Sequence, residues 1–175
     1  MLLISRREML QRLGATLTAA TVLPLALPAR ARAQAAVAES FISFTAAEAQ
    51  TVKAIVARII PSDENGPGAL EARADRFIDR ALAGALKASR PAYATGLAAV
   101  NAAARTSKGK DFAQLSAADQ DAVLTSVQQT SGQFFNLIRT HTIQGTFSDP
   151  FYGGNANFIG WDLKRFLEWC GCGSD

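Results

Sequence analysis

The chain has 175 residues, 49% of them hydrophobic, which fits one globular domain with a core of its own. Its formal net charge is +3, but five of the 18 basic residues lie within residues 1–33, beside one of the 15 acidic residues. The remaining 13 basic and 14 acidic residues give residues 34–175 a net charge of −1. Without residues 1–33 the chain is near neutral, so its basic overall composition is no indication of a nucleic acid or an anionic membrane as partner, and no nucleic acid partner is expected.

Residues 1–33 are predicted to be an export signal and not part of the fold. A basic head with Arg6 and Arg7 precedes a modestly apolar stretch, and Ala31 and Ala33 offer the small side chains that signal peptidase accepts. The paired arginines resemble the twin-arginine (Tat) signal. An uncleaved membrane anchor is the alternative, but the apolar run is roughly 15 residues, short of the roughly 20 that span a bilayer. Because the Tat pathway exports folded proteins, this chain or a bound partner is expected to carry a cofactor.

The rest of the chain, residues 34–175, is predicted to be a single helical domain. It begins with a flexible lead over residues 34–43. Thr45 and Glu48 form a capping-box pattern at the start of the first helix, and Pro61 ends that helix.

Three further helices are predicted after a polar turn. The second is expected over about residues 70–86, Pro91 suits the first turn of the third, and Ser116 caps the fourth. Apolar residues at helical spacing predict that the fourth helix continues as one element that includes Ile138. A helical tail is expected over residues 162–175. No alternating strand pattern occurs, so the fold class is all-α, with four to five helices and a long aromatic and glycine-rich loop near the C-terminus.

The predicted mature chain contains few groups suited to chemistry. Its one histidine, His141, is interpreted as a structural hydrogen-bonding residue, and its two cysteines, Cys170 and Cys172, are too few for a structural zinc or an iron–sulfur cluster. The acidic pair Asp75 and Asp79 lies beside arginines at helical spacing and is interpreted as a solvated, salt-bridged face. No glycine-rich nucleotide motif occurs. We therefore expect no catalytic residue, cofactor or metal in this chain.

One segment, FSDPFYGGNANFIGW at residues 147–161, gathers five aromatic residues, three glycines and two asparagines. It lacks Lys, Arg and His, which makes it a poor phosphate site. Asp149 before Pro150 indicates a turn and not catalysis. The residues alone leave two alternatives open: the aromatic side chains cover the core of the domain, or they form a docking surface for another protein.

Three segments, RIIPSDENGPGALEARADRFIDRAL, FAQLSAADQDAVL and FFNLIRTHTIQGTFSDPFYGGNANFIGW, resemble the small subunit (subunit 3) of the gluconate 2-dehydrogenase family. The resemblance covers roughly residues 44–161, and residues 142–161 are its most specific part. It implies a non-catalytic subunit beside a large FAD-binding flavoprotein of the GMC type, which oxidises a sugar or sugar acid. It also implies a cytochrome subunit that holds haem c and passes electrons to the membrane quinone pool.

The resemblance also implies a location and a role in export. The large subunit of such complexes often lacks a signal and crosses the membrane with a signal-bearing partner. We therefore expect this chain to engage the Tat translocase, to assist the folding, stability and export of the flavoprotein, and to reside in the periplasm at the inner membrane. The aromatic segment is expected to form the interface with the flavoprotein through Phe147, Asp149, Pro150, Tyr152, Gly153, Gly154, Asn155 and Trp161.

The chain departs from the family after Trp161, where DLKRFLEWCGCGSD replaces the usual Gly- and Pro-containing tail. In an oxidising periplasm Cys170 and Cys172 can form a strained disulfide with each other or a bond to a partner, or remain inert in a flexible tail. Two other function classes stay open. One is an independent periplasmic helical protein whose aromatic loop binds a small ligand, and the other is a self-sufficient enzyme, against which the few chemical groups argue.

Overall fold

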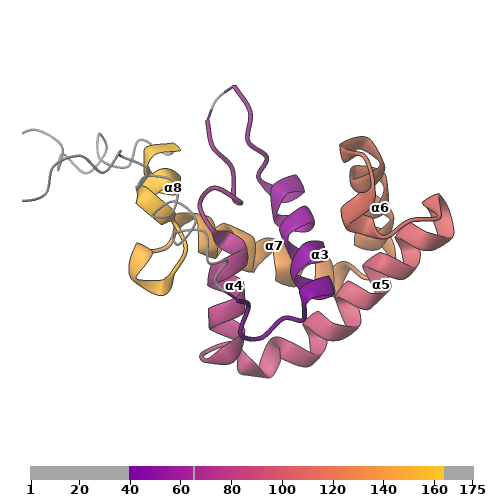
Figure 1. Cartoon of the computed structure of the whole chain (residues 1–175), viewed down its shortest axis with the longest axis horizontal. Helices are drawn as coiled ribbons and strands as arrows, with labels where there is room; N and C mark the ends of the chain where they lie inside the picture. Colours follow the sequence, from indigo (N-terminus) through magenta and orange to yellow (C-terminus); the bar gives the residue numbers. More distant parts are fainter. Residues whose placement is uncertain (1–39, 65, 164–175) are drawn as a thin grey trace, which may run out of the picture. The chain divides into compact units, whose positions relative to one another are not determined.

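The computed structural model describes residues 40–64 and 66–163, and Figure 1 shows the elements in chain order. The residues of the predicted export signal and of the predicted disulfide lie outside the described residues: Arg6, Arg7, Ala31, Ala33, Cys170 and Cys172. Their roles remain predictions from the sequence.

The described residues fold into α-helices joined by turns and short 3₁₀ segments, with no strand among them. This confirms the prediction of an all-α fold. In the described part, no helix combines the length and the apolar composition needed to cross a bilayer. The α-helices are α3 (Ala46–Ile59), α4 (Ala74–Ala83), α5 (Arg90–Lys108), α6 (Ala117–Thr130), α7 (Gly132–Phe147) and α8 (Ile159–Leu163). The 3₁₀ segments are η1 (Lys87–Ser89), η2 (Phe112–Gln114), η3 (Pro150–Tyr152) and η4 (Ala156–Phe158).

Helix starts that depend on local sequence lie where the sequence predicts them. At the start of α3, the Thr45 hydroxyl accepts a hydrogen bond from the Glu48 N–H at 3.3 Å, and the Glu48 carboxylate accepts one from the Thr45 N–H at 2.9 Å. This reciprocal pair is the predicted capping box. Ser116 accepts a hydrogen bond from the backbone N–H of Asp119 at the start of α6, and a proline occupies the first turn of α5.

The second helix is shorter than predicted. The expected range was residues 70–86, but α4 begins at Ala74, because Arg73 adopts a left-handed conformation with φ of 60° and the residues before it form a tight turn. Gly84 leaves the helical backbone and ends α4. Helix propensity alone did not show that a hydrogen-bonded turn over residues 68–74 precedes the helix.

The predicted fourth helix is two helices, α6 and α7, because the backbone of Ser131 is not helical (φ −137°, ψ 47°). The turn at Ser131 directs the Phe134 ring onto α5, where a Cβ at Gly96 would lie only 2.2 Å from that ring. Phe134 also packs edge-on against Tyr93, with ring centroids 5.7 Å apart. A tertiary contact with α5 therefore accompanies a break that the apolar spacing does not reveal.

The core lies among α3, α4, α5, α6 and α7, with α4 packed along α7 and α6 packed against both α5 and α7. Burying one large aliphatic or aromatic side chain contributes about 1.5–3 kcal/mol to folding. The largest fully buried apolar side chains are Tyr93, Phe112, Ile55, Ile78, Leu82, Leu97 and Ile138.

Asp79 was interpreted from the sequence as part of a solvated face, but it is buried. It binds the backbone of the residues that immediately precede α3. Its carboxylate accepts hydrogen bonds from the backbone N–H groups of Ile42 (2.7 Å), Ser43 (2.7 Å) and Phe44 (3.1 Å). Arg90 donates to the Ser43 carbonyl at 3.0 Å. The last residues of the lead predicted to be flexible are thus fixed to α4 and α5.

Asp75, the other member of that acidic pair, is also buried, one turn before Asp79 on α4. Burial raises the pKa of its carboxyl, although the backbone N–H of Arg76 and the charges of Arg76, Lys53 and Arg73 favour the ionised form. The interpretation of Asp75 and Asp79 as solvated was wrong, because helical spacing does not tell which face of α4 meets the core.

Candidate interaction surface

The candidate surface is built on residues 148–161, here called the aromatic loop, which follow α7 and include the first three residues of α8. Asp149 begins the loop by accepting a hydrogen bond from the Phe151 N–H at 2.8 Å, which starts η3. Gly153 then adopts a φ of 91°, a conformation that side-chain-bearing residues rarely adopt. The indication of turn chemistry at Asp149 and Pro150 is thus confirmed.

Asn155 fixes the centre of the aromatic loop to the end of α7. It is fully buried, and its N–H donates to the Gly145 carbonyl at 2.7 Å. Its side-chain amide donates to the Ser148 carbonyl at 2.9 Å and accepts from the Gly160 N–H at 2.7 Å. All three bonds lie within this chain, so in the isolated protein Asn155 organises the loop from the inside.

The aromatic loop lies directly on the backbone of α7. A Cβ at Gly154 would lie 2.0 Å from the Gly145 carbonyl oxygen, and a Cβ at Gly160 would lie 1.9 Å from the carbonyl oxygen of Thr146. Real Cβ atoms do not approach an oxygen so closely, so glycine is required at both positions. The glycines seen in the sequence therefore serve close packing within the domain.

The aromatic side chains of the loop are largely at the surface. The exposed fraction is 87% for Phe151, 61% for Tyr152 and 51% for Phe158. Phe151 and Tyr152 pack edge-on with centroids 5.4 Å apart, and Phe158 packs against Trp161 at 5.3 Å. The bulky Phe158 is held in a left-handed conformation with φ of 61°, which places strain beside the exposed rings.

The structure places some residues of this segment inside the domain and others at its surface, and a docking role for the exposed ones stays a prediction. Asn155 and Gly154 are buried, and Pro150, Gly153 and Trp161 are half-buried, as is Phe147 at the end of α7. Trp161 donates from its indole nitrogen to the Phe147 carbonyl at 2.9 Å. Asp149 and Tyr152 are exposed, as are Phe151 and Phe158, which were not among the predicted interface residues. No periodic signal distinguishes the exposed aromatic residues of a loop from the buried ones.

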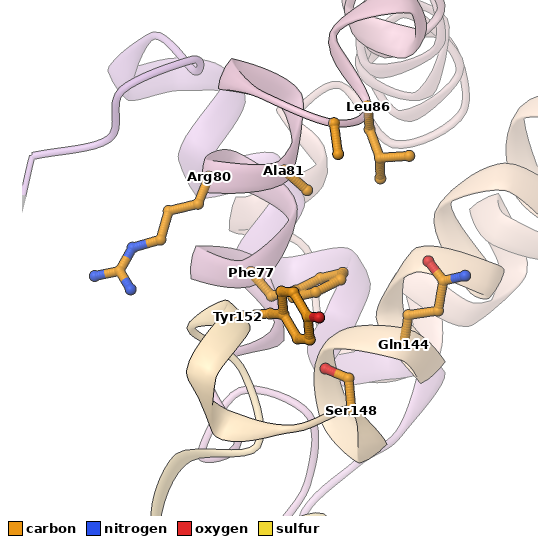
Figure 2. Close-up of a pocket in the computed structure, with 8 residues that line it drawn as sticks. Phe77, Arg80, Ala81, Leu86, Gln144, Ser148 and Tyr152 are labelled. Atoms are coloured by element: carbon orange, nitrogen blue, oxygen red, sulfur yellow. The ribbon is translucent and has the colours of Figure 1, made fainter.

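Next to Tyr152 lies a groove of about 530 Å³ between α4 and the end of α7 (Figure 2). One wall comes from α4 and the turn after it, and the other comes from α7 and η3. The residues of the first wall are Phe77, Ala81, Ala85 and Leu86, and those of the second are Gln144, Ser148 and Tyr152. Arg80 also lines the groove, and its guanidinium lies against Gly153.

His141 lies in the core, within hydrogen-bonding distance of Tyr93. The Tyr93 hydroxyl is 3.0 Å from Nδ1 of His141, and the two rings are stacked. Burial lowers the pKa of His141 and raises that of Tyr93. These contacts agree with the interpretation of His141 as a structural residue. Within the described residues, no three His, Cys, Asp or Glu side chains gather in a way that could hold a metal ion.

Comparison of the sequence with models of known protein families finds one matching family. The family model described as gluconate 2-dehydrogenase subunit 3 matches residues 46–166, a range that contains the whole aromatic loop and every residue that lines the groove. No significant match was found among curated proteins or among solved structures.

Proposed function

Because the chain belongs to the gluconate 2-dehydrogenase subunit 3 family, and is therefore a subunit of a multi-subunit dehydrogenase complex, we propose that it is the non-catalytic small subunit of that complex. The complex is periplasmic and associated with the inner membrane. Its large subunit is a GMC-type flavoprotein that oxidises a sugar or sugar acid. This chain assists the folding, stability and Tat-dependent export of the flavoprotein.

The observation that best supports this proposal is that buried residues of the aromatic loop fix its backbone while other residues of the loop are exposed. Buried hydrogen bonds from Asn155 and close packing of Gly154 fix the loop backbone on α7. The same backbone presents Phe151, Tyr152 and Phe158 to the outside. A rigid backbone that displays aromatic side chains loses little conformational entropy on binding, and aromatic residues are frequent among the side chains that dominate binding energy.

The proposal assigns each cofactor to a partner subunit. FAD belongs to the flavoprotein, and haem c belongs to a cytochrome subunit that receives its electrons. No step of the oxidation is assigned to a residue of this chain, whose buried His141 and Tyr93 bond each other within the core. The contribution of the chain is thus a folded surface and an export signal.

Purification of the complex from native membranes tests the proposal. An affinity tag at the C-terminus of this chain should recover a flavoprotein in a fixed ratio to it, together with sugar or sugar-acid dehydrogenase activity. Identification of the subunits by mass spectrometry establishes which proteins are present. Recovery of this chain by itself, with the dehydrogenase activity in a separate fraction, would contradict the proposal.

A further inference from the structure

The groove beside Tyr152 combines one apolar wall with one edge that contains hydrogen-bonding groups. Phe77, Ala81 and Leu86 form much of the apolar wall, while Ser148 and Gln144 lie on the side of α7 (Figure 2). A site of this kind suits an apolar group attached to a polar one, because a few placed polar groups set its orientation.

The Ser148 hydroxyl is the buried side-chain polar atom that lacks a hydrogen-bond partner among the described residues. Leaving a buried hydroxyl unpaired opposes folding, so such a group calls for an explanation. Because Ser148 lines the groove although its hydroxyl oxygen is covered, rotation of this side chain toward the groove would offer the hydroxyl to an acceptor bound there.

The charged groups that line the groove indicate which charge a bound segment can carry. Among the described residues that line it there is no carboxylate, and Figure 2 shows the guanidinium of Arg80 directed away from the other lining side chains. A basic side chain would find no opposite charge there, so a non-basic segment fits better than a basic one. The groove is also continuous with the exposed aromatic surface, because Tyr152 belongs to both and packs against Phe151.

From these observations we infer that the groove receives an extended, non-basic segment of the flavoprotein subunit. The segment inserts one apolar side chain between α4 and α7, and a main-chain carbonyl beside that side chain accepts a hydrogen bond from Ser148. The exposed rings of Phe151 and Tyr152 then cover the inserted segment. This inference rests on the proposed function and names where on this chain the partner is held.

A pair of substitutions at one end of α4 tests the groove. Ala85 and Ala83 are both exposed, but Ala85 lines the groove and Ala83 does not. Full-length Ala85→Trp should fill the groove and weaken binding to the purified flavoprotein subunit at least tenfold, with an unchanged Tm of the isolated chain. The matched Ala83→Trp chain should bind like the wild type.

A second variant tests the hydrogen bond. Ser148→Ala removes a hydroxyl that is unpaired in the isolated chain, so the Tm of the isolated chain should stay the same or rise. If Ser148 donates to the partner, the affinity for the flavoprotein subunit should fall about tenfold, which corresponds to about 1.4 kcal/mol. A higher Tm with unchanged affinity would mean that the Ser148 hydroxyl only destabilises the isolated chain and does not bind the partner. This result would overturn the proposed hydrogen bond from Ser148.

The outcomes separate the inference from the proposed function. If the wild-type chain does not bind the flavoprotein, the proposed function fails and the inference with it. If the wild type binds and Ala85→Trp binds equally well, only the groove inference fails. A lower Tm of isolated Ala85→Trp, absent in Ala83→Trp, would show that residues of this chain fill the groove, and would overturn the inference as well.

Discussion

The Tyr93 hydroxyl lies 3.0 Å from Nδ1 of His141, which joins α5 to α7 inside the core. The rings are stacked with an interplanar angle of 9°. A neutral imidazole can accept this hydrogen bond at Nδ1, whereas a protonated one has a proton there. A protonated His141 could donate from Nδ1 to the Tyr93 oxygen, but its charge would be buried, so burial favours the neutral form of His141.

The stability of the chain should therefore fall as the medium becomes acidic. Burial lowers the pKa of His141 below its ordinary value of 6.5, so the unfolded chain takes up a proton first as the pH falls. The stabilising contribution is complete above that value and is lost as the pH falls through the lower pKa of the folded state. Thermal unfolding between about pH 7.5 and pH 5 measures this loss.

His141→Gln is the control for this pH dependence, because the chain has no other histidine. The variant should have a lower Tm at neutral pH and a flatter profile. Asp75 titrates with the opposite sign, since burial raises its pKa and protonation at low pH stabilises the fold. An equal slope in the wild type and in His141→Gln would contradict the assignment.

Replacing Asp79 should destabilise the domain far more than replacing Asp75. Asp79→Ala leaves three backbone N–H groups of residues 42–44 without their acceptor, and each unpaired buried group costs about 1–3 kcal/mol where water cannot reach it. Asp75→Asn removes a charge whose burial is unfavourable, so the free energy of unfolding should stay the same or rise. Urea titrations of both variants measure the difference, and similar losses would contradict it.

Gly154→Ala should unfold or strongly destabilise the chain. The added Cβ would lie 2.0 Å from the Gly145 carbonyl oxygen, so either the aromatic loop or α7 must move. Gly132→Ala is the matched control, because a Cβ at Gly132 meets no atom within 4 Å. Its Tm should remain the same or rise slightly, since alanine favours helix more than glycine does. Equal Tm values for the two variants would mean that the loop does not pack on α7 in this way.

Tyr152→Ala should weaken the complex without unfolding the isolated subunit. Tyr152 is 61% exposed, so its truncation removes little core packing. Truncating an interface aromatic that dominates binding costs about 2 kcal/mol or more, or about 30-fold in affinity. In contrast, Asn155→Ala should lower the Tm of the isolated subunit, because Asn155 makes buried hydrogen bonds to Ser148 and Gly160. If Tyr152→Ala unfolds the subunit, the ring belongs to the core and not to an interface.

The parts of the fold predicted from the sequence depend on neighbouring residues. The Thr45–Glu48 capping box and the Ser116 cap each join residues three positions apart, so a short motif identifies them. The break at Ser131 could not be predicted in this way, because it accompanies the packing of Phe134 on Gly96 of another helix. Apolar spacing continues across the break.

The same distinction explains what was missed in the site. The composition of residues 147–161 indicated an unusual segment, but not that Asn155 faces inward while Phe151 and Phe158 face outward. The role of Asp79 depends on backbone groups 35–37 positions away in the chain. The groove depends on α4 and α7, whose packing no local pattern encodes.

The most direct test of the central claim, that this chain exports the flavoprotein, uses Arg6→Lys combined with Arg7→Lys. Dehydrogenase activity is measured in periplasmic and cytoplasmic fractions, with Arg12→Lys as a control outside the arginine pair. We expect the double variant to lose periplasmic activity and to retain the flavoprotein in the cytoplasm, while the control behaves like the wild type. Unchanged periplasmic activity of the flavoprotein in the double variant would contradict the claim.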